Sequence, residues 1–106
     1  MRAVINVGTM KNVQPQDVPA GAQIIDVREN DEYATDHAQG VIHIPMGEVL
    51  NRLAEIDPGQ DIYVICKSGG RSARVAEQLE QTQGWECINV EGGTDLWREL
   101  GLPMES

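Results

Sequence analysis

The residues with the clearest chemical potential lie in one stretch, Cys66-Lys67-Ser68-Gly69-Gly70-Arg71-Ser72. It follows the apolar run 62–65 and precedes a helical pattern over 73–83, which predicts a strand, a tight turn and a helix in succession. Glycines let several backbone N–H groups converge on one point, because no side chain obstructs them. Such amides, with the positive end of a helix, bind negative charge. We expect Cys66, at the mouth of this site, to be held as a thiolate.

Simple energetics support an ionised Cys66. A free thiol with a pKa near 8.5 is only about 3% ionised at pH 7, and lowering that pKa by about two units requires roughly 2.7 kcal/mol. A helix terminus supplies up to about 1–2 kcal/mol, and a charge-assisted hydrogen bond roughly 1.5–3 kcal/mol. The loop can therefore ionise Cys66 without a histidine base, which predicts a nucleophile.

The competing interpretation is that Cys66 is a small buried hydrophobic residue, as most cysteines at strand ends are. Two neighbouring features argue against it. Two glycines follow within four positions, and three of the eight basic residues of an acidic chain, Lys67, Arg71 and Arg74, lie within eight positions of each other. A solvated basic helix face would explain Arg74 alone.

At these residues the sequence resembles the rhodanese-like sulfurtransferase family, whose active loop runs Cys, four residues, then Arg or Thr. Cys66 to Arg71 fits that frame. The resemblance continues at Ile25-Asp26-Val27-Arg28-Glu29, Glu32-Tyr33, His37, Gly40, Ile44-Pro45, Glu91-Gly92-Gly93 and Trp97. The chain departs from the family at the neighbours of His37, where Asp36 replaces the usual glycine and Ala38 the usual isoleucine.

The resemblance implies a rhodanese-like α/β fold, with a central, mainly parallel sheet of about five strands and helices on both faces. We expect one domain over residues 1–106, with 1–10 a tail or an extra strand. The resemblance makes Cys66 the catalytic residue and implies no cofactor and no metal. The substrate-binding loop would be Lys67, Ser68, Gly69, Gly70, Arg71 and Ser72, and the structural residues near the site Asp26, Arg28, Gly92, Gly93 and Trp97.

Sulfur transfer is the implied activity. The Cys66 thiolate would take a sulfane sulfur from thiosulfate or a protein persulfide and pass it to cyanide, a thiol or a thioredoxin-like acceptor. Lys67 and Arg71 would hold an anionic donor, and Ser72 would hydrogen-bond the loop or cap the helix. The alternatives are a cysteine-based phosphatase or arsenate reductase, which generally has five residues between Cys and Arg, and a non-catalytic binding module on the same fold. The donor, the acceptor and the oligomeric state stay open.

Composition narrows the remaining possibilities. At 106 residues the chain makes one domain, and the absence of Phe requires an aliphatic core. A net charge of −9 argues against nucleic acid or an anionic membrane as partner. No apolar run is long enough to span a membrane, and the N-terminal stretch 1–7 has too short an apolar run for a signal peptide. Only two cysteines, Cys66 and Cys87, favour reduced thiols in the cytoplasm.

The predicted elements position the loop at a sheet edge. Strands are expected at 22–27, 41–44, 61–65 and 85–90, with a first strand beginning at 11–13, and helices at 14–18, 32–37, 46–56, 72–83 and 95–100. Asn30 or Asp31 would cap the second helix. The strand, helix and strand over 61–90 predict a parallel crossover, which places the loop at the carboxyl end of a strand, where such sheets bind ligands.

Four further residues have structural interpretations. His37 and His43 are expected to be hydrogen-bonded framework residues, because neither has metal-ligand spacing with a cysteine. Trp97 is expected to anchor the last helix in the core rather than contact substrate. Cys87 is expected to be inert packing, with a resolving thiol as the alternative.

Overall fold

Five parallel strands form the central sheet of the protein, which a computed structural model describes over residues 11–106. Across the sheet the order is β1-β6-β5-β2-β4, and every pairing is parallel, which confirms the expected fold class. The bounds are Lys11–Val13 for β1, Gln23–Asp26 for β2, Ile42–His43 for β4, Ile62–Ile65 for β5 and Cys87–Val90 for β6. The expectation for residues 1–10 lies outside the described residues.

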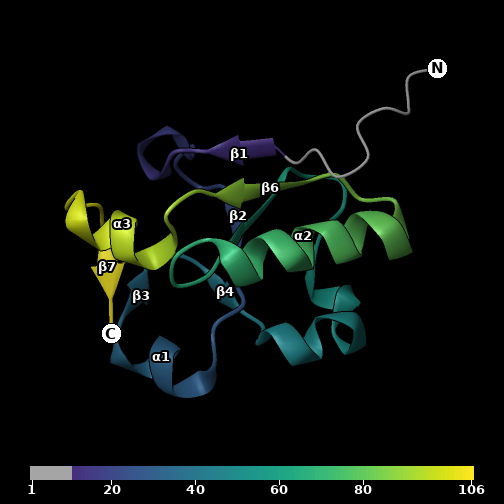
Figure 1. Cartoon of the computed structure of the whole chain (residues 1–106), viewed down its shortest axis with the longest axis horizontal. Helices are drawn as coiled ribbons and strands as arrows, with labels where there is room; N and C mark the ends of the chain where they lie inside the picture. Colours follow the sequence, from purple (N-terminus) through teal and green to yellow (C-terminus); the bar gives the residue numbers. More distant parts are fainter. Residues whose placement is uncertain (1–10) are drawn as a thin grey trace.

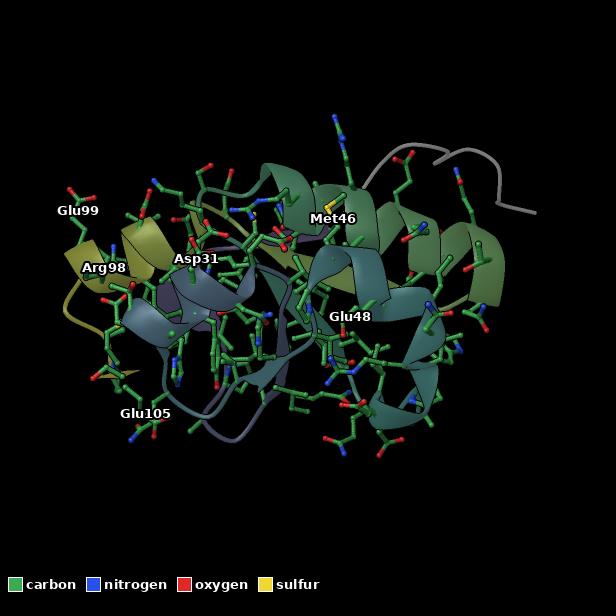
Figure 2. All side chains as sticks on the ribbon, turned by 90° about the horizontal axis from the view of Figure 1, so that it is seen from below. Asp31, Met46, Glu48, Arg98, Glu99 and Glu105 are labelled. Carbon is green, nitrogen blue, oxygen red and sulfur yellow. The ribbon has the colours of Figure 1, made fainter. Side chains whose placement is uncertain are left out.

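Helices cover both faces of this sheet (Figure 1). On one face lie α2 (Gly70–Gln83) and two 3₁₀ helices, η3 (Met46–Asn51) and η4 (Leu53–Glu55). On the other lies α3 (Gly93–Glu99), with the 3₁₀ helix η2 (Pro15–Asp17) packed against it. Figure 2 shows charged side chains around the outside of the fold, among them Arg98 and Glu99 of α3. Because helices cover both faces, the buried apolar side chains form two cores, one on each side of the sheet.

The side chains of strand β5 alternate between the two faces of the sheet, and this alternation sets the direction of the Cys66 side chain. All four of its residues are buried. Ile62 and Val64 join the core under α2, whereas Tyr63 and Ile65 join the core under α3. Successive side chains of a strand point to opposite faces, so the next residue, Cys66, points toward α2, and its side chain belongs to the α2 core.

Helix α2 begins and ends at glycines. Its N-cap is Gly69, with φ of +115°, and its C-cap is Gly84, with φ of +75°, where the amide donates to Glu80 O at 2.9 Å. Both are left-handed conformations that residues with a Cβ avoid. The predicted end at Gly84 is confirmed, and the helix starts two residues before the predicted Ser72.

Several predicted boundaries were wrong. Helix α1 spans Asn30–Thr35 rather than 32–37, and its cap is Glu29, which forms a capping box with Glu32. A reciprocal pair of this kind satisfies two amides at once, so neither Asn30 nor Asp31 is needed as a cap. Helix α3 begins at Gly93 rather than residue 95, and the single helix expected over 46–56 is instead η3 and η4.

A small second sheet was not predicted. His37, expected as the end of a helix, lies in β3 (His37–Ala38), which pairs antiparallel with β7 (Met104–Glu105). Each strand has only two residues, too few for a periodic pattern, and its partner is far away in the sequence. The pairing fixes the C-terminal segment beside α1 and α3 (Figure 1).

Candidate active site

Cys66 lies at the floor of the loop rather than at its mouth, with only 1% of the residue exposed. It follows directly on β5, in the central position of the sheet, and precedes the turn that opens α2. Parallel strands end at one edge of a sheet, and loops at that edge form ligand sites. The predicted placement of the loop is confirmed.

Backbone amides and one hydroxyl surround the Cys66 sulfur. The amide of Gly69 donates to Sγ at 3.1 Å, and the hydroxyl of Ser72 lies 3.3 Å from Sγ. The amides of Ser68 and Ser72 also help to lower the pKa of this thiol. Two of these amides belong to the cap and first turn of α2, whose macrodipole is positive there. The sulfur is therefore held in a nest of donors, as predicted.

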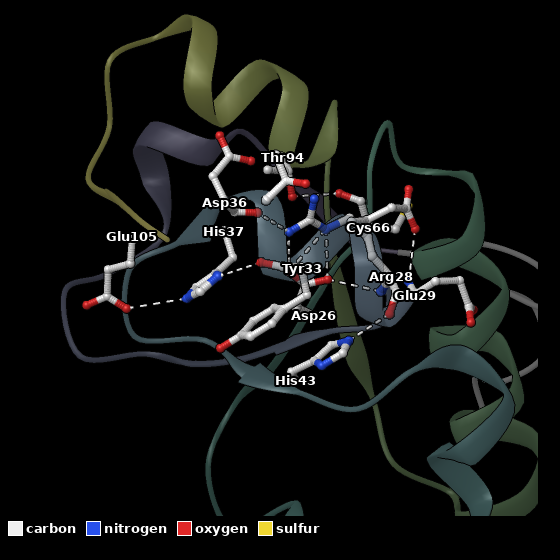
Figure 3. A network of polar contacts seen from close by, with 12 residues as sticks. Asp26, Arg28, Glu29, Tyr33, Asp36, His37, His43, Cys66, Thr94 and Glu105 are labelled. Carbon is white, nitrogen blue, oxygen red and sulfur yellow. Dashed lines mark hydrogen bonds and ion pairs between the residues drawn. The ribbon is translucent and has the colours of Figure 1, made fainter.

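The start of α3 holds the loop in this conformation from behind. The amide and hydroxyl of Thr94 donate to Cys66 O at 2.8 and 3.0 Å, and the amide of Asp95 donates to Lys67 O at 3.0 Å (Figure 3 shows Thr94 beside Cys66). The first two carbonyls of the loop therefore face α3. With these carbonyls held by α3, the amide of Gly69 points toward the sulfur.

Gly93 makes that close approach possible. A Cβ built on Gly93 would lie 2.5 Å from both Cys66 O and Lys67 O, and the residue has φ of +59°. A side chain at Gly93 would therefore push α3 off the loop. The neighbouring Gly92 has φ of +76°, and a Cβ there would collide with the side chain of Leu96.

The pKa of Cys66 lies below its ordinary value. Burial opposes ionisation and raises the pKa, because a charge loses its hydration. Hydrogen bonds from the Ser72 hydroxyl and from the amides of Ser72, Gly69 and Ser68 outweigh that effect. The thiolate is thus stabilised by loop donors.

The two cations of the loop are already paired. Arg71 makes a bidentate ion pair with Glu32 of α1, at 2.8 and 2.9 Å, and Lys67 Nζ lies 2.8 Å from Asp95 Oδ2. The Arg71 guanidinium, which is the leading cause, lowers the pKa of Glu32 to about 2. The Lys67 pair is largely exposed, so its partners separate at little cost. An anion that binds Arg71 must instead compete with a carboxylate.

Asp26 and Arg28 form a buried framework at the end of β2. Arg28 donates to both Asp26 oxygens at 3.0–3.2 Å and to Asp36 O at 2.7 Å (Figure 3). Both residues are almost fully buried, and their side chains hydrogen-bond to each other and to Asp36 O rather than to the Cys66 sulfur. Because Val27 N donates to Ile65 O at 3.0 Å, this framework braces the strand end that carries Cys66. The structural interpretation of the pair is supported.

The two histidines and Trp97 also have framework positions. Tyr33 is stacked between His37 and His43, with ring centroids 3.8 and 4.2 Å apart. His43 Nε2 donates to Arg28 O at 2.8 Å (Figure 3). Trp97 is buried in the core under α3, on the opposite face of the sheet from the Cys66 side chain, and donates to Pro103 O. Its predicted role as a core anchor is confirmed.

Sequence reasoning missed three residues around the loop: Glu32 as the partner of Arg71, Thr94 as the anchor of the Cys66 carbonyl, and Asn89, whose Oδ1 lies 2.5 Å from Ser72 Oγ. Asn89 had a readable signal, because it is a polar residue inside an otherwise apolar strand. Glu32 and Thr94 could be assigned only from tertiary geometry. Among the described residues, 11–106, no group of three or more His, Cys, Asp or Glu could hold a metal ion, and no helix has the length and apolarity to cross a membrane.

The fold and the loop define a class of protein: a parallel α/β domain that presents a cysteine inside a ring of donors. The chain belongs to the rhodanese-like domain family, whose model matches residues 10–100. GlpE of Actinobacillus pleuropneumoniae serotype 3, a thiosulfate sulfurtransferase, is 34% identical over 87 residues, which cover 81% of this chain and 80% of that protein.

Two further comparisons bear on the fold and on chain length. A rhodanese-related protein from Thermoplasma volcanium superimposes with a TM-score of 0.82 at 30% identity, covering 90% of this chain and 97% of the other. YrkF of Bacillus subtilis is 40% identical over 84 residues, which cover 79% of this chain but only 45% of that relative. The family fold is therefore established, whereas whole-protein activities of longer relatives do not transfer directly.

Proposed function

We propose that this domain is a sulfurtransferase that carries a sulfane sulfur on Cys66. The observation that supports it most is the donor ring around Sγ, which lowers the pKa of a buried thiol. A thiolate is the nucleophilic form of cysteine. The similarity to a thiosulfate sulfurtransferase supports the same chemistry.

The proposed reaction has two displacement steps. The Cys66 thiolate attacks the outer sulfur of thiosulfate, the new S–S bond forms, and sulfite leaves with the electron pair of the broken bond. A protein persulfide would donate in the same way, with its thiolate leaving. An acceptor then attacks the outer sulfur of the Cys66 persulfide and regenerates the thiolate; with cyanide the product is thiocyanate.

The loop would hold the transferred sulfur as an anion. A persulfide carries its charge on the outer sulfur, so the amides of the α2 N-terminus would stabilise it as they stabilise the thiolate. Lys67 is the cation best able to bind a small anionic donor, because its ion pair with Asp95 is exposed to solvent and separates at little cost. Arg71 would keep its contact with Glu32 and contribute as a fixed charge at the loop.

The four-residue spacing between Cys66 and Arg71 also bears on the alternative chemistry. A cysteine-based phosphatase or arsenate reductase generally has five residues there, which make a wider cradle for a tetrahedral oxyanion, so the shorter loop of this chain favours a single sulfur atom. We therefore place phosphate and arsenate chemistry second.

We also place the domain in a reducing compartment such as the cytoplasm, which keeps both cysteines as the free thiols seen here.

The test is intact mass spectrometry after exposure to thiosulfate, followed by cyanide. We expect a gain of one sulfur atom, mapped to Cys66 and removed by cyanide with formation of thiocyanate. Cys66→Ser should show no gain, and the matched control Cys87→Ser should behave as the unmodified protein does. A sulfur adduct that persists in Cys66→Ser, or rapid aryl phosphate hydrolysis without any adduct, would overturn the proposal.

A further inference from the structure

A row of polar side chains leads from the Cys66 sulfur to the edge of the sheet. Ser72 Oγ lies 3.3 Å from Sγ and 2.5 Å from Asn89 Oδ1, and Asn89 Nδ2 lies 3.0 Å from Asn12 Oδ1. Ser72 is fully buried and Asn89 is 6% exposed, whereas Asn12 lies exposed on the edge strand β1. The sulfur-transfer chemistry proposed above assigns no role to Asn89 or Asn12.

The Ser72 hydroxyl cannot serve all its neighbours at once. It has one proton to donate and faces three acceptors: Cys66 Sγ at 3.3 Å, Gly69 O at 3.2 Å and Asn89 Oδ1 at 2.5 Å. The shortest contact is to Asn89. When the proton points at the amide oxygen, the sulfur receives no hydrogen bond from the hydroxyl.

The ionised sulfur requires the opposite arrangement. A hydrogen bond to a charged acceptor is stronger than one to a neutral acceptor, so the thiolate draws the Ser72 proton toward itself. The Asn89 oxygen would then face a Ser72 lone pair at 2.5 Å, which is repulsive. A half-turn of the Asn89 amide removes the conflict, because its NH₂ group then donates to Ser72 Oγ. The reversed Asn89 would present its oxygen to Asn12, whose amide carries an NH₂ group as well as an oxygen and has to turn with it.

We propose that Asn89 is a positioning residue whose amide orientation decides, through Ser72, whether the Cys66 sulfur receives a hydroxyl hydrogen bond. One orientation holds the hydroxyl away from a neutral thiol, and the other releases it to an anionic sulfur. The inference builds on the proposed role of Cys66 as the nucleophile. It also explains why a nearly buried strand position carries a polar residue, which is costly unless hydrogen-bonded.

The charged groups near the loop do not supply this effect. Arg71, on α2, interacts with Cys66 through space, but its charge is paired with Glu32 of α1. Lys67, in the loop, is paired with Asp95 of α3. These pairs stay in place whichever way the Asn89 amide is turned.

The test compares two substitutions of similar volume, Asn89→Asp and Asn89→Leu, each with Ser72 or with Ser72→Ala. The readout is the pH dependence of Cys66 alkylation by iodoacetamide, measured in a Cys87→Ser background. A carboxylate at position 89 can only accept, so it should hold the Ser72 proton away from sulfur. We expect a Cys66 pKa about one unit higher with Asp than with Leu, or about tenfold less thiolate at a pH below both values.

The Ser72→Ala background separates an effect through the Ser72 hydroxyl from direct repulsion between a carboxylate at position 89 and the Cys66 thiolate. If residue 89 acts on the sulfur through the Ser72 hydroxyl, the difference in Cys66 pKa between Asn89→Asp and Asn89→Leu should fall below half its size in the Ser72→Ala background. An undiminished difference, or no difference with Ser72 present, would overturn the inference. Alkylation reports thiolate directly, so these results stand apart from whether sulfur transfer occurs.

A second measurement needs no substitution at Asn89. In the unmodified protein, the side-chain NH₂ resonances of Asn89 should shift with the same midpoint as Cys66 ionisation. The shift should be lost in Ser72→Ala. Asn89 signals that stay constant through the Cys66 titration would contradict the amide reversal, even if an Asp variant failed to fold.

Discussion

Cys66 and Cys87 are similarly buried, at 1% and 5% exposed, and both side chains belong to the core under α2. Their acid–base behaviour is opposite. Burial raises the pKa of Cys87 to about 11, with the carboxylate of Glu80 adding to the effect. At Cys66 the same opposing effect of burial is outweighed, and the pKa lies below its ordinary value.

The difference comes from the position of each residue in its strand. Cys87 is the first residue of β6, where the following amides belong to strand pairing, and its thiol has a long contact of 3.8 Å with Trp85 O. Cys66 comes after the last residue of β5, where the chain leaves the sheet and opens a helix. Burial alone therefore raises the pKa of a thiol. Burial beneath a helix N-terminus, with amides free to turn inward, lowers it.

The largest expected effect comes from removing the support behind the loop. Gly93→Ala would place a methyl group 2.5 Å from two loop carbonyls, and we expect a loss of about 3–4 kcal/mol in unfolding free energy. The alkylation pKa of Cys66 should rise, while that of Cys87 should not change. Urea denaturation and mapped alkylation measure the two effects.

Gly101→Ala is the matched control for that substitution. Gly101 also has positive φ, at +75°, but open space surrounds its would-be Cβ. Gly101→Ala should lose only about 1–2 kcal/mol of unfolding free energy, the cost of placing a residue with a Cβ at positive φ. Equal losses in the two variants would show that contact between α3 and the loop is not what Gly93 protects.

A smaller effect is expected from the Ser72 hydroxyl. Ser72→Ala removes a donor to the Cys66 sulfur, and the alkylation pKa of Cys66 should rise by about one unit. Ser68→Ala is the control, because Ser68 acts on the sulfur through its backbone amide, which alanine keeps. If both variants raised the pKa equally, the donor ring described here would be wrong.

The smallest effect concerns the ion pair between Arg71 and Glu32. The pKa of Glu32 is lowered to about 2 from an ordinary value of 4.5, so the pair stabilises the fold above pH 4.5 and is lost as the pH falls toward 2. Between pH 6 and pH 2.5 the unmodified protein should lose about 1 kcal/mol more than Glu32→Gln, since solvent screens this partly exposed pair. Urea denaturation at the two pH values measures it.

Glu77→Gln, on the exposed side of α2, controls for the loss of one negative charge. The same Glu32→Gln variant sharpens the comparison of cysteines. Because amides and Ser72 dominate at Cys66, its pKa should move by less than about half a unit. A larger change in the Cys66 pKa would mean that nearby side-chain charges, rather than loop donors, cause the opposite pKa shifts of Cys66 and Cys87.

The sequence predicts the part of the site that is local. An apolar strand, two glycines and a helical pattern occur within about 20 consecutive residues, so the loop, the end of α2 at Gly84 and the sheet edge follow from nearby residues. The glycine pair at 92–93 was also found by its resemblance to a known pattern. Its physical reason, contact with the carbonyls of Cys66 and Lys67, required the fold.

The remaining features depend on contacts between distant segments. The pairing of β3 with β7 joins residues more than 60 positions apart in strands of two residues. The stripe at Met46, Val49 and Leu53 predicts a helix but not its type, since 3₁₀ and α helices both bring residues three apart onto similar faces. The carboxylate partners of Lys67 and Arg71 lie 28 and 39 positions away, beyond any local pattern.

Loop donors give Cys66 a lower pKa than Cys87, a thiol of similar burial. Alkylation of both cysteines in one sample of the folded protein, from pH 4 to pH 12 and mapped by mass spectrometry, tests it directly. We predict that Cys66 reacts with a midpoint below the ordinary thiol value and that Cys87 reacts with a midpoint near 11. Titration of Cys66 at or above the ordinary value would contradict the account.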